Sequence, residues 1–173
     1  MKKTLLLALI IFNLCLVEVG AQNTKDEKPD LIPVAQTAKK PASIQSWEAE
    51  VVKLVNSQRS NRGLQTLKSN WEIARVARYK SQDMINKNYF SHISPTFGSP
   101  FKMMESFGIR FSAAGENIAM GQRTPSEVMN SWMNSPGHRA NILSPSYTTI
   151  GVGLAKSKTG VCYWTQMFTK PTK

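Results

Sequence analysis

Residues 126–143 read SEVMNSWMNSPGHRANIL. We expect the rest of the chain to fold around this stretch. Its first apolar side chains recur at positions i, i+1, i+4 and i+5, which places them on one face of a helix: Val128, Met129, Trp132 and Met133. Just upstream, Thr124 and Pro125 supply an N-cap and a first-turn proline. The pattern predicts an amphipathic helix with Trp132 in the core.

The same stretch continues into a histidine. Pro136 and Gly137 are typical of a helix end, and the next side chain is His138. The chain has two histidines, and the other one, His92, also follows a predicted helix end, near Asn88. Because imidazoles are common ligands of Zn²⁺ and similar ions, both histidines are candidate functional residues.

Glu127 has two interpretations. Its spacing from Thr124 is that of a capping box, in which Glu127 accepts a hydrogen bond from the Thr124 amide. On a helical wheel of ~100° per residue, Glu127 also lines up with Ser131 and Asn134 beside the apolar face. That polar line would border a cleft. The two interpretations are compatible, and the sequence leaves both open.

The beginning of the chain predicts export. Residues 1–21 have the features of a secretory signal peptide: Lys2 and Lys3, an apolar run over residues 5–16, and small residues up to Ala21. The apolar run is shorter than the ~20 residues that a membrane-spanning helix needs. We therefore expect an extracytoplasmic protein, secreted or periplasmic.

The rest of the chain predicts a linker and one domain. Residues 22–42 are polar and contain three prolines, which is typical of a disordered linker. The folded domain is expected over residues 43–170. After removal of the signal peptide, Cys162 is the one cysteine left, so no disulfide can form within the chain. A domain of this size can be held together by its hydrophobic core.

The charge balance indicates which partners to expect. The chain has 22 Lys and Arg residues against 11 Asp and Glu residues, and removing Lys2, Lys3 and Glu18 with the signal peptide leaves 20 against 10, or +10. Such an excess favours contact with wall polymers or lipid headgroups. The basic residues are scattered, which is also typical of a solvated surface, and no nucleic-acid motif is present. We expect a monomer without a nucleic-acid partner and with at most peripheral membrane contact.

Helix signals recur through the first half of the domain. A cap at Ser46 predicts a helix that ends near Arg62, and the capping-box spacing of Ser69 and Glu72 predicts a second helix. A third, short helix is expected over residues 101–107.

Strand signals dominate the second half. An apolar segment around Glu116 predicts a short strand, and alternation over residues 148–155 and 161–168 predicts a C-terminal hairpin. Gly151 and Gly153 lie on one face of that hairpin and would let another element approach closely. This order of elements is typical of a layered α+β domain rather than of βαβ units.

Several motifs follow one another in register along the chain: Asn56 with Arg59, YFSH at 89–92, GENIA at 115–119, Glu127 with Trp132, SPGHR at 135–139, GVG at 151–153 and YWTQMF at 163–168. Together they resemble the CAP superfamily, which includes cysteine-rich secretory proteins, insect antigen 5 and plant pathogenesis-related class 1 proteins. The resemblance covers about residues 44–169. It implies a three-layer α-β-α sandwich with a central antiparallel sheet.

The resemblance also implies a cleft lined by two histidines and two glutamates, which correspond here to His92, Glu116, Glu127 and His138. Considered alone, Glu116 would more often be an exposed charge at a strand edge. The chain lacks the disulfides of the eukaryotic members, so their sterol-binding and ion-channel activities are not carried over.

Two functions remain open for this cleft. His92 and His138 would bind Zn²⁺ or another divalent metal in a module that also holds an extracytoplasmic ligand. Alternatively, Glu116 and Glu127 would be the catalytic acid and base of a hydrolase acting on the cell wall or another extracytoplasmic polymer.

Overall fold

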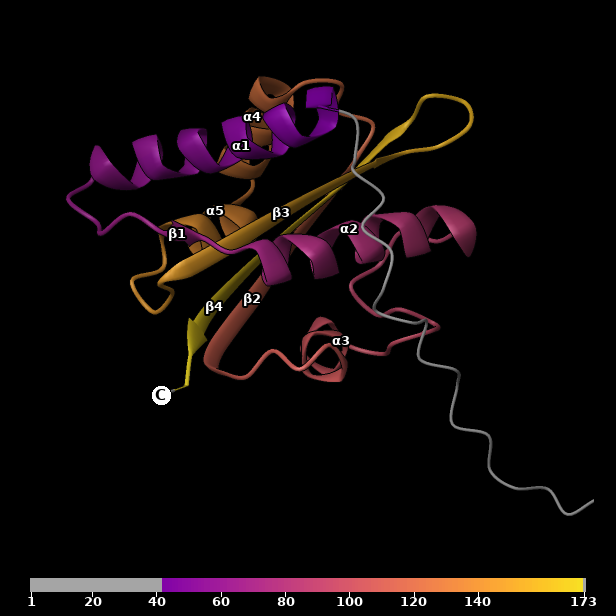
Figure 1. Ribbon diagram of the computed structural model, residues 1–173. Coiled ribbons are helices and arrows are strands. Elements are labelled where there is room, and N and C mark those ends of the chain that lie inside the picture. Colours follow the sequence, from indigo (N-terminus) through magenta and orange to yellow (C-terminus); the bar gives the residue numbers. More distant parts are fainter. Residues whose placement is uncertain (1–41, 173) are drawn as a thin grey trace, which may run out of the picture. The chain divides into compact units, whose positions relative to one another are not determined.

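The computed structural model describes residues 42–172 (Figure 1). The predicted signal peptide and all but the last residue of the predicted linker lie outside the described residues. Within residues 42–172, no helix combines the length and the apolar character needed to cross a membrane. The first helix, α1 (Ala42–Ser60), already includes Ser46, so the predicted cap at Ser46 was wrong. Residues 42–45 read ASIQ and contain no helix breaker, which allows the earlier start.

A four-stranded sheet in the order β1-β3-β4-β2 forms the middle layer of the domain. Its three longer strands are β2 (Phe111–Met120), β3 (Thr149–Lys156) and β4 (Cys162–Pro171), and β4 runs antiparallel to both of its neighbours. The predicted C-terminal hairpin is thus confirmed as β3 and β4. The two-residue strand β1 (Lys68–Ser69) pairs in parallel with β3, which adds a short parallel strand to the predicted antiparallel sheet.

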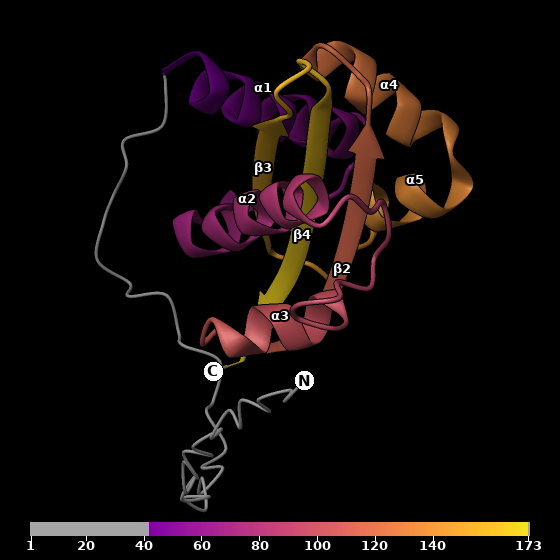
Figure 2. The same cartoon turned by 90° about the vertical axis from the view of Figure 1, so that its right-hand side faces the viewer.

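Helices cover both faces of the sheet, which confirms the predicted α-β-α sandwich (Figures 1 and 2). On one face, α1 packs with α4 (Pro125–Asn134) and α5 (Pro136–Leu143) in a core that includes Trp132 and Trp164. On the other face lie α2 (Trp71–Asn86) and α3 (Pro100–Ser106), whose core includes Ile73, Met104 and Met167.

Two glycines allow α2 to lie close to the sheet. A Cβ atom at Gly151 would come within 2.2 Å of the Ala74 nitrogen, and one at Gly153 would come within 2.2 Å of the Ala77 carbonyl carbon. Both contacts are with backbone atoms, which cannot rotate away. The predicted close approach at these glycines is confirmed.

Two other helix starts lie at or next to the predicted caps. At the start of α4, the Thr124 hydroxyl accepts a hydrogen bond from the Glu127 amide (3.1 Å), as predicted. At the start of α2, the cap is Asn70 rather than Ser69, because the Asn70 side chain accepts a hydrogen bond from the Ile73 amide (3.0 Å). A short amide side chain is as good an N-cap as a hydroxyl.

Pro136 ends one helix and begins another. The predicted helix end at Pro136 and Gly137 is thus followed at once by a new helix. Pro136 is the first residue of α5, and His138 lies in its first turn. Proline suits a first helical turn because its φ angle is already helical and its missing N–H would have no partner there.

Side chains cover the free edge of β2, the last strand in the sheet order. Three alternate carbonyls of this strand accept hydrogen bonds from side chains: Ala114 from the Tyr147 hydroxyl (3.2 Å), Glu116 from the Asn141 amide (3.1 Å) and Ile118 from the Trp132 indole (3.2 Å). These contacts protect the edge from pairing with another strand. They also fasten α4 and α5 alongside Glu116.

Candidate functional site

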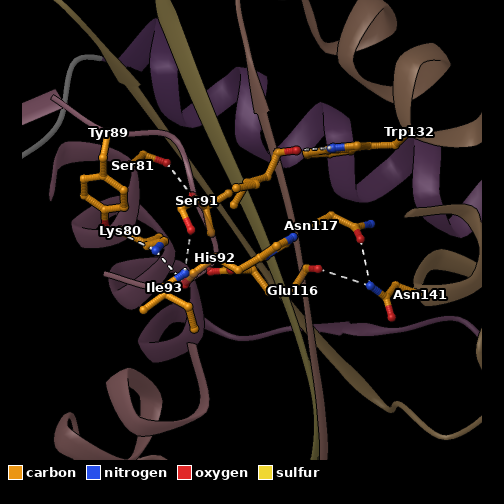
Figure 3. A network of polar contacts seen from close by, with 12 residues as sticks. Lys80, Ser81, Tyr89, Ser91, His92, Ile93, Glu116, Asn117, Trp132 and Asn141 are labelled. Atoms are coloured by element: carbon orange, nitrogen blue, oxygen red, sulfur yellow. Dashed lines mark hydrogen bonds and ion pairs between the residues drawn. The ribbon is translucent and has the colours of Figure 1, made fainter. Parts of the chain in front are cut away.

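Glu116 is a buried residue of β2, with its side chain 1% exposed. Its Oε1 atom lies 2.7 Å from Nδ1 of His92, and its Oε2 atom is buried without a hydrogen-bond partner. Figure 3 shows the two residues among their polar neighbours. An ionised carboxylate can only accept, so Nδ1 of His92 would be the donor to it.

His92 lies in the loop between α2 and α3, and its side chain is 51% exposed. Two buried side chains of α2 hold this loop. The Lys80 ammonium donates to the His92 carbonyl (2.8 Å), and the Asp83 carboxylate accepts hydrogen bonds from three loop hydroxyls, those of Tyr89, Ser94 and Thr96. The half-exposed imidazole is therefore carried by a main chain that is fixed from the protein interior.

His138 lies on α5, which contacts the same strand, β2. The Asn117 amide donates to the His138 carbonyl (3.1 Å), and the Asn141 amide donates to the Asn117 side-chain oxygen (2.8 Å). Burial, and then the charge of His92, lower the pKa of His138. Nδ1 of His138 is buried and has no hydrogen-bond partner. The structure thus pairs His92 with Glu116 and fastens the main chain of His138 to Asn117, the residue after Glu116.

Glu127 has other contacts. Its side chain is exposed, and Oε2 accepts a hydrogen bond from the Arg123 amide (2.8 Å), one residue before the predicted partner Thr124. Ser131 and Asn134 are exposed as well, which agrees with the predicted polar line. Within residues 42–172, the structure gives Glu127 no hydrogen bond or ion pair with His92, Glu116 or His138. Its place in a shared site stays a prediction.

Two hollows of the surface lie elsewhere. One, of about 440 Å³, is formed by α1 and the start of α4 and includes Trp47 and Thr124. A second, of about 300 Å³, is formed by α1, α2 and β3 and includes Glu48 and Trp71. Neither is lined by any of the four predicted site residues. No group of three or more His, Cys, Asp and Glu side chains in the described part of the chain is arranged to hold a metal ion.

Sequence reasoning missed the residues that support the site. Lys80 and Asp83 are buried on α2, although both are charged. A signal was present, because Lys80 follows Ile73 and Ala77 at helical spacing and therefore falls on the stripe that faces the sheet. A lysine on an apolar stripe is expensive to bury and calls for a partner.

Comparisons with known sequences agree with the fold. Residues 52–168 match the family described as CAP, the Cysteine-rich secretory protein family. The chain is 50% identical over 148 residues to uncharacterized protein YkwD of Bacillus subtilis (strain 168), covering 85% of this chain and 56% of that protein. It is 37% identical over 123 residues to uncharacterized membrane protein YlbC of the same strain, covering 71% of this chain and 34% of that protein. The chain thus spans about half the length of YkwD and about a third of the length of YlbC.

Solved structures show the same architecture. An extracellular protein containing a SCP domain from Bacillus anthracis str. Ames is 34% identical, with a TM-score of 0.68, and covers 73% of this chain and 41% of that chain. An outer surface protein from Borrelia burgdorferi is 19% identical, with a TM-score of 0.69 and coverage of 74% and 95%. The second likeness concerns the fold alone.

Proposed function

The chain belongs to the cysteine-rich secretory protein family, the CAP family, and from this premise we propose that it is an extracytoplasmic binding protein. Its binding site is the group formed by His92, Glu116 and His138, called the His–Glu site below. The two imidazoles bind a divalent cation such as Zn²⁺, and Glu116 orients His92. When bound, such an ion supplies a positive charge for an anionic oxygen of an extracytoplasmic ligand.

The hydrogen bond between His92 Nδ1 and Glu116 Oε1 carries this proposal. Histidines that bind metals usually donate their other ring N–H to a carboxylate, which fixes the tautomer and the ring orientation. Glu116 is suited to that role because its side chain is buried, whereas about half of the His92 side chain stays exposed.

The residues fit an exchangeable cation site rather than a structural one. Structural zinc sites have four protein ligands and catalytic sites usually have three, whereas this site offers two imidazoles. Water or a ligand would complete the shell. Such a site suits reversible capture of an anionic group.

Charge and relatives support a role outside the cytoplasm. A net charge of +11 favours anionic surroundings such as wall polymers or lipid headgroups. Of the two solved relatives, one is described as an extracellular protein and the other as an outer surface protein. Together with the predicted signal peptide, these features support export of this chain.

Calorimetric titration of the purified chain with Zn²⁺ alone tests the proposal. We expect saturable binding near neutral pH that weakens on acidification, because protonated imidazoles do not ligate. His92→Gln and His138→Gln should each lower the affinity by more than about 100-fold, and Glu116→Gln by about 10–100-fold. Glu127→Gln is the matched control and should leave it unchanged. Equal affinity in the wild type and both histidine variants would contradict the proposal.

One observation favours a second candidate, hydrolysis of a wall polymer. An imidazole that is hydrogen-bonded to a buried carboxylate is also the arrangement of an oriented general base. In that case His92 would be the general base that contacts the substrate, and Glu116 would act by orienting His92. The exposed Glu127 would be the acid. Turnover of purified cell walls by chelator-treated protein, lost in Glu127→Gln with the fold intact, would favour this candidate. The absence of turnover in the wild type would exclude it.

A further inference from the structure

Trp71, the first residue of α2, is 55% exposed. It forms part of the wall of the hollow of about 300 Å³ between α1, α2 and β3. A single exposed apolar side chain is ordinary on a protein surface. Trp71 calls for an explanation because its ring is held in place from the interior of the protein.

The support of this ring begins in the sheet. The Leu154 amide of β3 donates to Oε1 of Glu48 on α1 (2.8 Å), and Glu48 is 4% exposed. The Arg78 guanidinium donates to both oxygens of Glu48, at 2.8 to 3.1 Å. Its central carbon lies over the Trp71 ring, 4.6 Å from the ring centre. Because the planar guanidinium is fixed by a fork of hydrogen bonds, the indole rests on a rigid support.

A supported ring is prepared to bind. An ordered side chain loses little further conformational freedom when a ligand packs against it, so this part of the cost of binding is already met. More than half of the Trp71 surface stays open to solvent although the guanidinium lies over the ring. The open surface of the indole is a flat apolar plate beside the hollow.

Polar groups with unused hydrogen-bonding capacity line the same hollow. They are the side-chain amide of Gln45, the hydroxyl of Ser69 and Nη1 of Arg78, none of which makes a hydrogen bond to another residue within residues 42–172. The two charged groups among the described lining residues are Glu48 and Arg78, and they are paired with each other (2.8 Å). The hollow therefore offers donors and acceptors with little net charge.

This composition indicates the chemistry of a ligand. A wholly apolar ligand would cover Gln45 and Arg78 without giving their polar atoms partners, which is costly. An ion would find no uncompensated charge of the opposite sign. A neutral molecule with one apolar face and polar groups at its rim satisfies both the plate and the polar wall.

A β-linked pyranose is such a molecule. Its axial C–H bonds form a flat apolar face that packs on an aromatic ring, and its equatorial hydroxyl and acetamido groups lie at the rim. The volume of about 300 Å³ is at the lower end of the ~300–1,000 Å³ typical of small-molecule sites. It suits one sugar ring of a chain that continues across the surface.

We propose that the hollow beside Trp71 is a saccharide-binding site, which stacks a pyranose ring of a neutral, β-linked glycan on the indole. It is separate from the His–Glu site. Ser69 belongs to β1, which leads into α2 at one edge of the sheet, whereas Glu116 belongs to β2 at the opposite edge (Figure 1). The inference therefore does not rest on the proposed function.

Titration of the full chain with the tetrasaccharide of β-1,4-linked N-acetylglucosamine provides the test. With ¹⁵N-labelled tryptophan, ¹H–¹⁵N correlation spectra show the indoles of the four tryptophans, and Trp71→Phe assigns the Trp71 signal. We expect a saturable shift of the Trp71 indole, while those of the buried Trp132 and Trp164 stay in place. The absence of a saturable Trp71 shift, or a shift confined to another tryptophan, would overturn the inference.

Calorimetric titration of variants tests the two kinds of contact. Trp71→Ala should lower the affinity for the tetrasaccharide by about 10-fold or more, and Trp71→Phe, which keeps a smaller plate, should lower it less. Gln45→Ala should lower it by about 3–10-fold, the loss of one hydrogen bond. Phe101→Ala removes another exposed aromatic side chain, on α3, and is the matched control with wild-type affinity.

Each further outcome decides the question. Wild-type affinity in Trp71→Ala would overturn the inference, and Trp71→Phe and Gln45→Ala decide in its place if Trp71→Ala does not fold. His92→Gln should bind the tetrasaccharide as the wild type does, and lost binding in that variant would assign the glycan to the His–Glu site instead. A wild type that binds the tetrasaccharide but not Zn²⁺ would contradict the proposed function and leave this inference standing.

Discussion

Arg59 shows how a buried charge positions the site without belonging to it. It is 1% exposed, and its guanidinium donates to the carbonyls of Ile142 (2.8 Å) and Ser144 (2.7 Å) at the end of α5. The planar guanidinium offers several donors at fixed angles, which suits the unpaired carbonyls of a helix end. Because His138 is at the other end of α5, Arg59 fixes the helix that carries it, as Lys80 fixes the loop of His92.

Trp132 is the single residue whose loss should cost most in α4. It is fully buried, and its indole also donates to the Ile118 carbonyl (3.2 Å). Trp132→Ala should lower the free energy of unfolding by about 3–5 kcal/mol, measured by chemical denaturation. The exposed neighbour Ser131→Ala is the control and should change little. An unchanged free energy for Trp132→Ala would contradict its place in the core.

His138 should make the stability of the metal-free protein depend on pH. Its pKa is lowered from the ordinary 6.5 by burial first and then by His92, so the unfolded chain binds this proton more readily than the folded protein does. Stability from this group is therefore present above about pH 6.5 and is lost as the pH falls through the lower folded value. Melting temperatures with chelator, from pH 8 down to pH 5, should fall less in His138→Gln than in the wild type. Equal slopes would show that His138 is not the group responsible.

Among the elements, α5 and the loop after α2 do most to assemble the site. One is fastened to the edge strand β2 through Asn117 and Asn141, and the other to α2 through Lys80 and Asp83. Both elements are short or irregular, and these polar contacts add to the apolar packing of residues such as Ile142, which is fully buried. Lys80 and Asp83 both lie on α2, and the contact of α2 with the sheet depends in turn on the glycines of β3.

Adding one methyl group to β3 should therefore disturb α2. At Gly153 a Cβ atom would lie 2.2 Å from the Ala77 carbonyl carbon, whereas at Gly137 nothing lies within 4 Å. Gly153→Ala should cost about 1–3 kcal/mol or more of stability, as overpacking does. Gly137→Ala, in the first turn of α5, should be neutral or stabilising by up to about 1 kcal/mol. Equal denaturation curves for the two variants would contradict the close contact.

In the domain as a whole, stability comes from two cores, one on each face of the sheet. Cys162, the one cysteine among the described residues, is free and buried, so no disulfide supports these cores. The two cores share the strands between them, which predicts that they unfold together in one transition.

Residues before α1 should be dispensable for that transition. A chain that begins at residue 40 retains all of α1 (Ala42–Ser60), whose Val51 and Val55 are fully buried. Its melting should match that of the full chain and remain cooperative. A broad or strongly lowered transition would show that the preceding residues contribute to the fold. Limited proteolysis should likewise leave a resistant core that starts close to Ala42.

Local patterns in the sequence determined most of the elements, although not β1 or the helix α5. The apolar spacing around Trp132, the alternation over β3 and β4 and the cap at Thr124 all concern neighbours in the chain, whose geometry repeats at 3.6 or 2 residues. Gly151 and Gly153 also belong to such a local pattern, because both lie on one face of a strand and leave that face without side chains at these positions. The family resemblance added the layered fold and pointed to four residues: His92, Glu116, Glu127 and His138.

What only the tertiary structure decided concerns groups that are distant in the chain. The depth at which Lys80 and Glu116 are buried depends on the order of the strands and on which helix covers which face. That Pro136 begins a helix carrying His138 depends on the hydrogen bonds between α5 and β2, and the contact of His92 with Glu116 depends on how the loop is held. The physical reason is that the cost of burying a charge, and the partner that offsets it, are set by atoms from other elements, which no periodicity along the chain records.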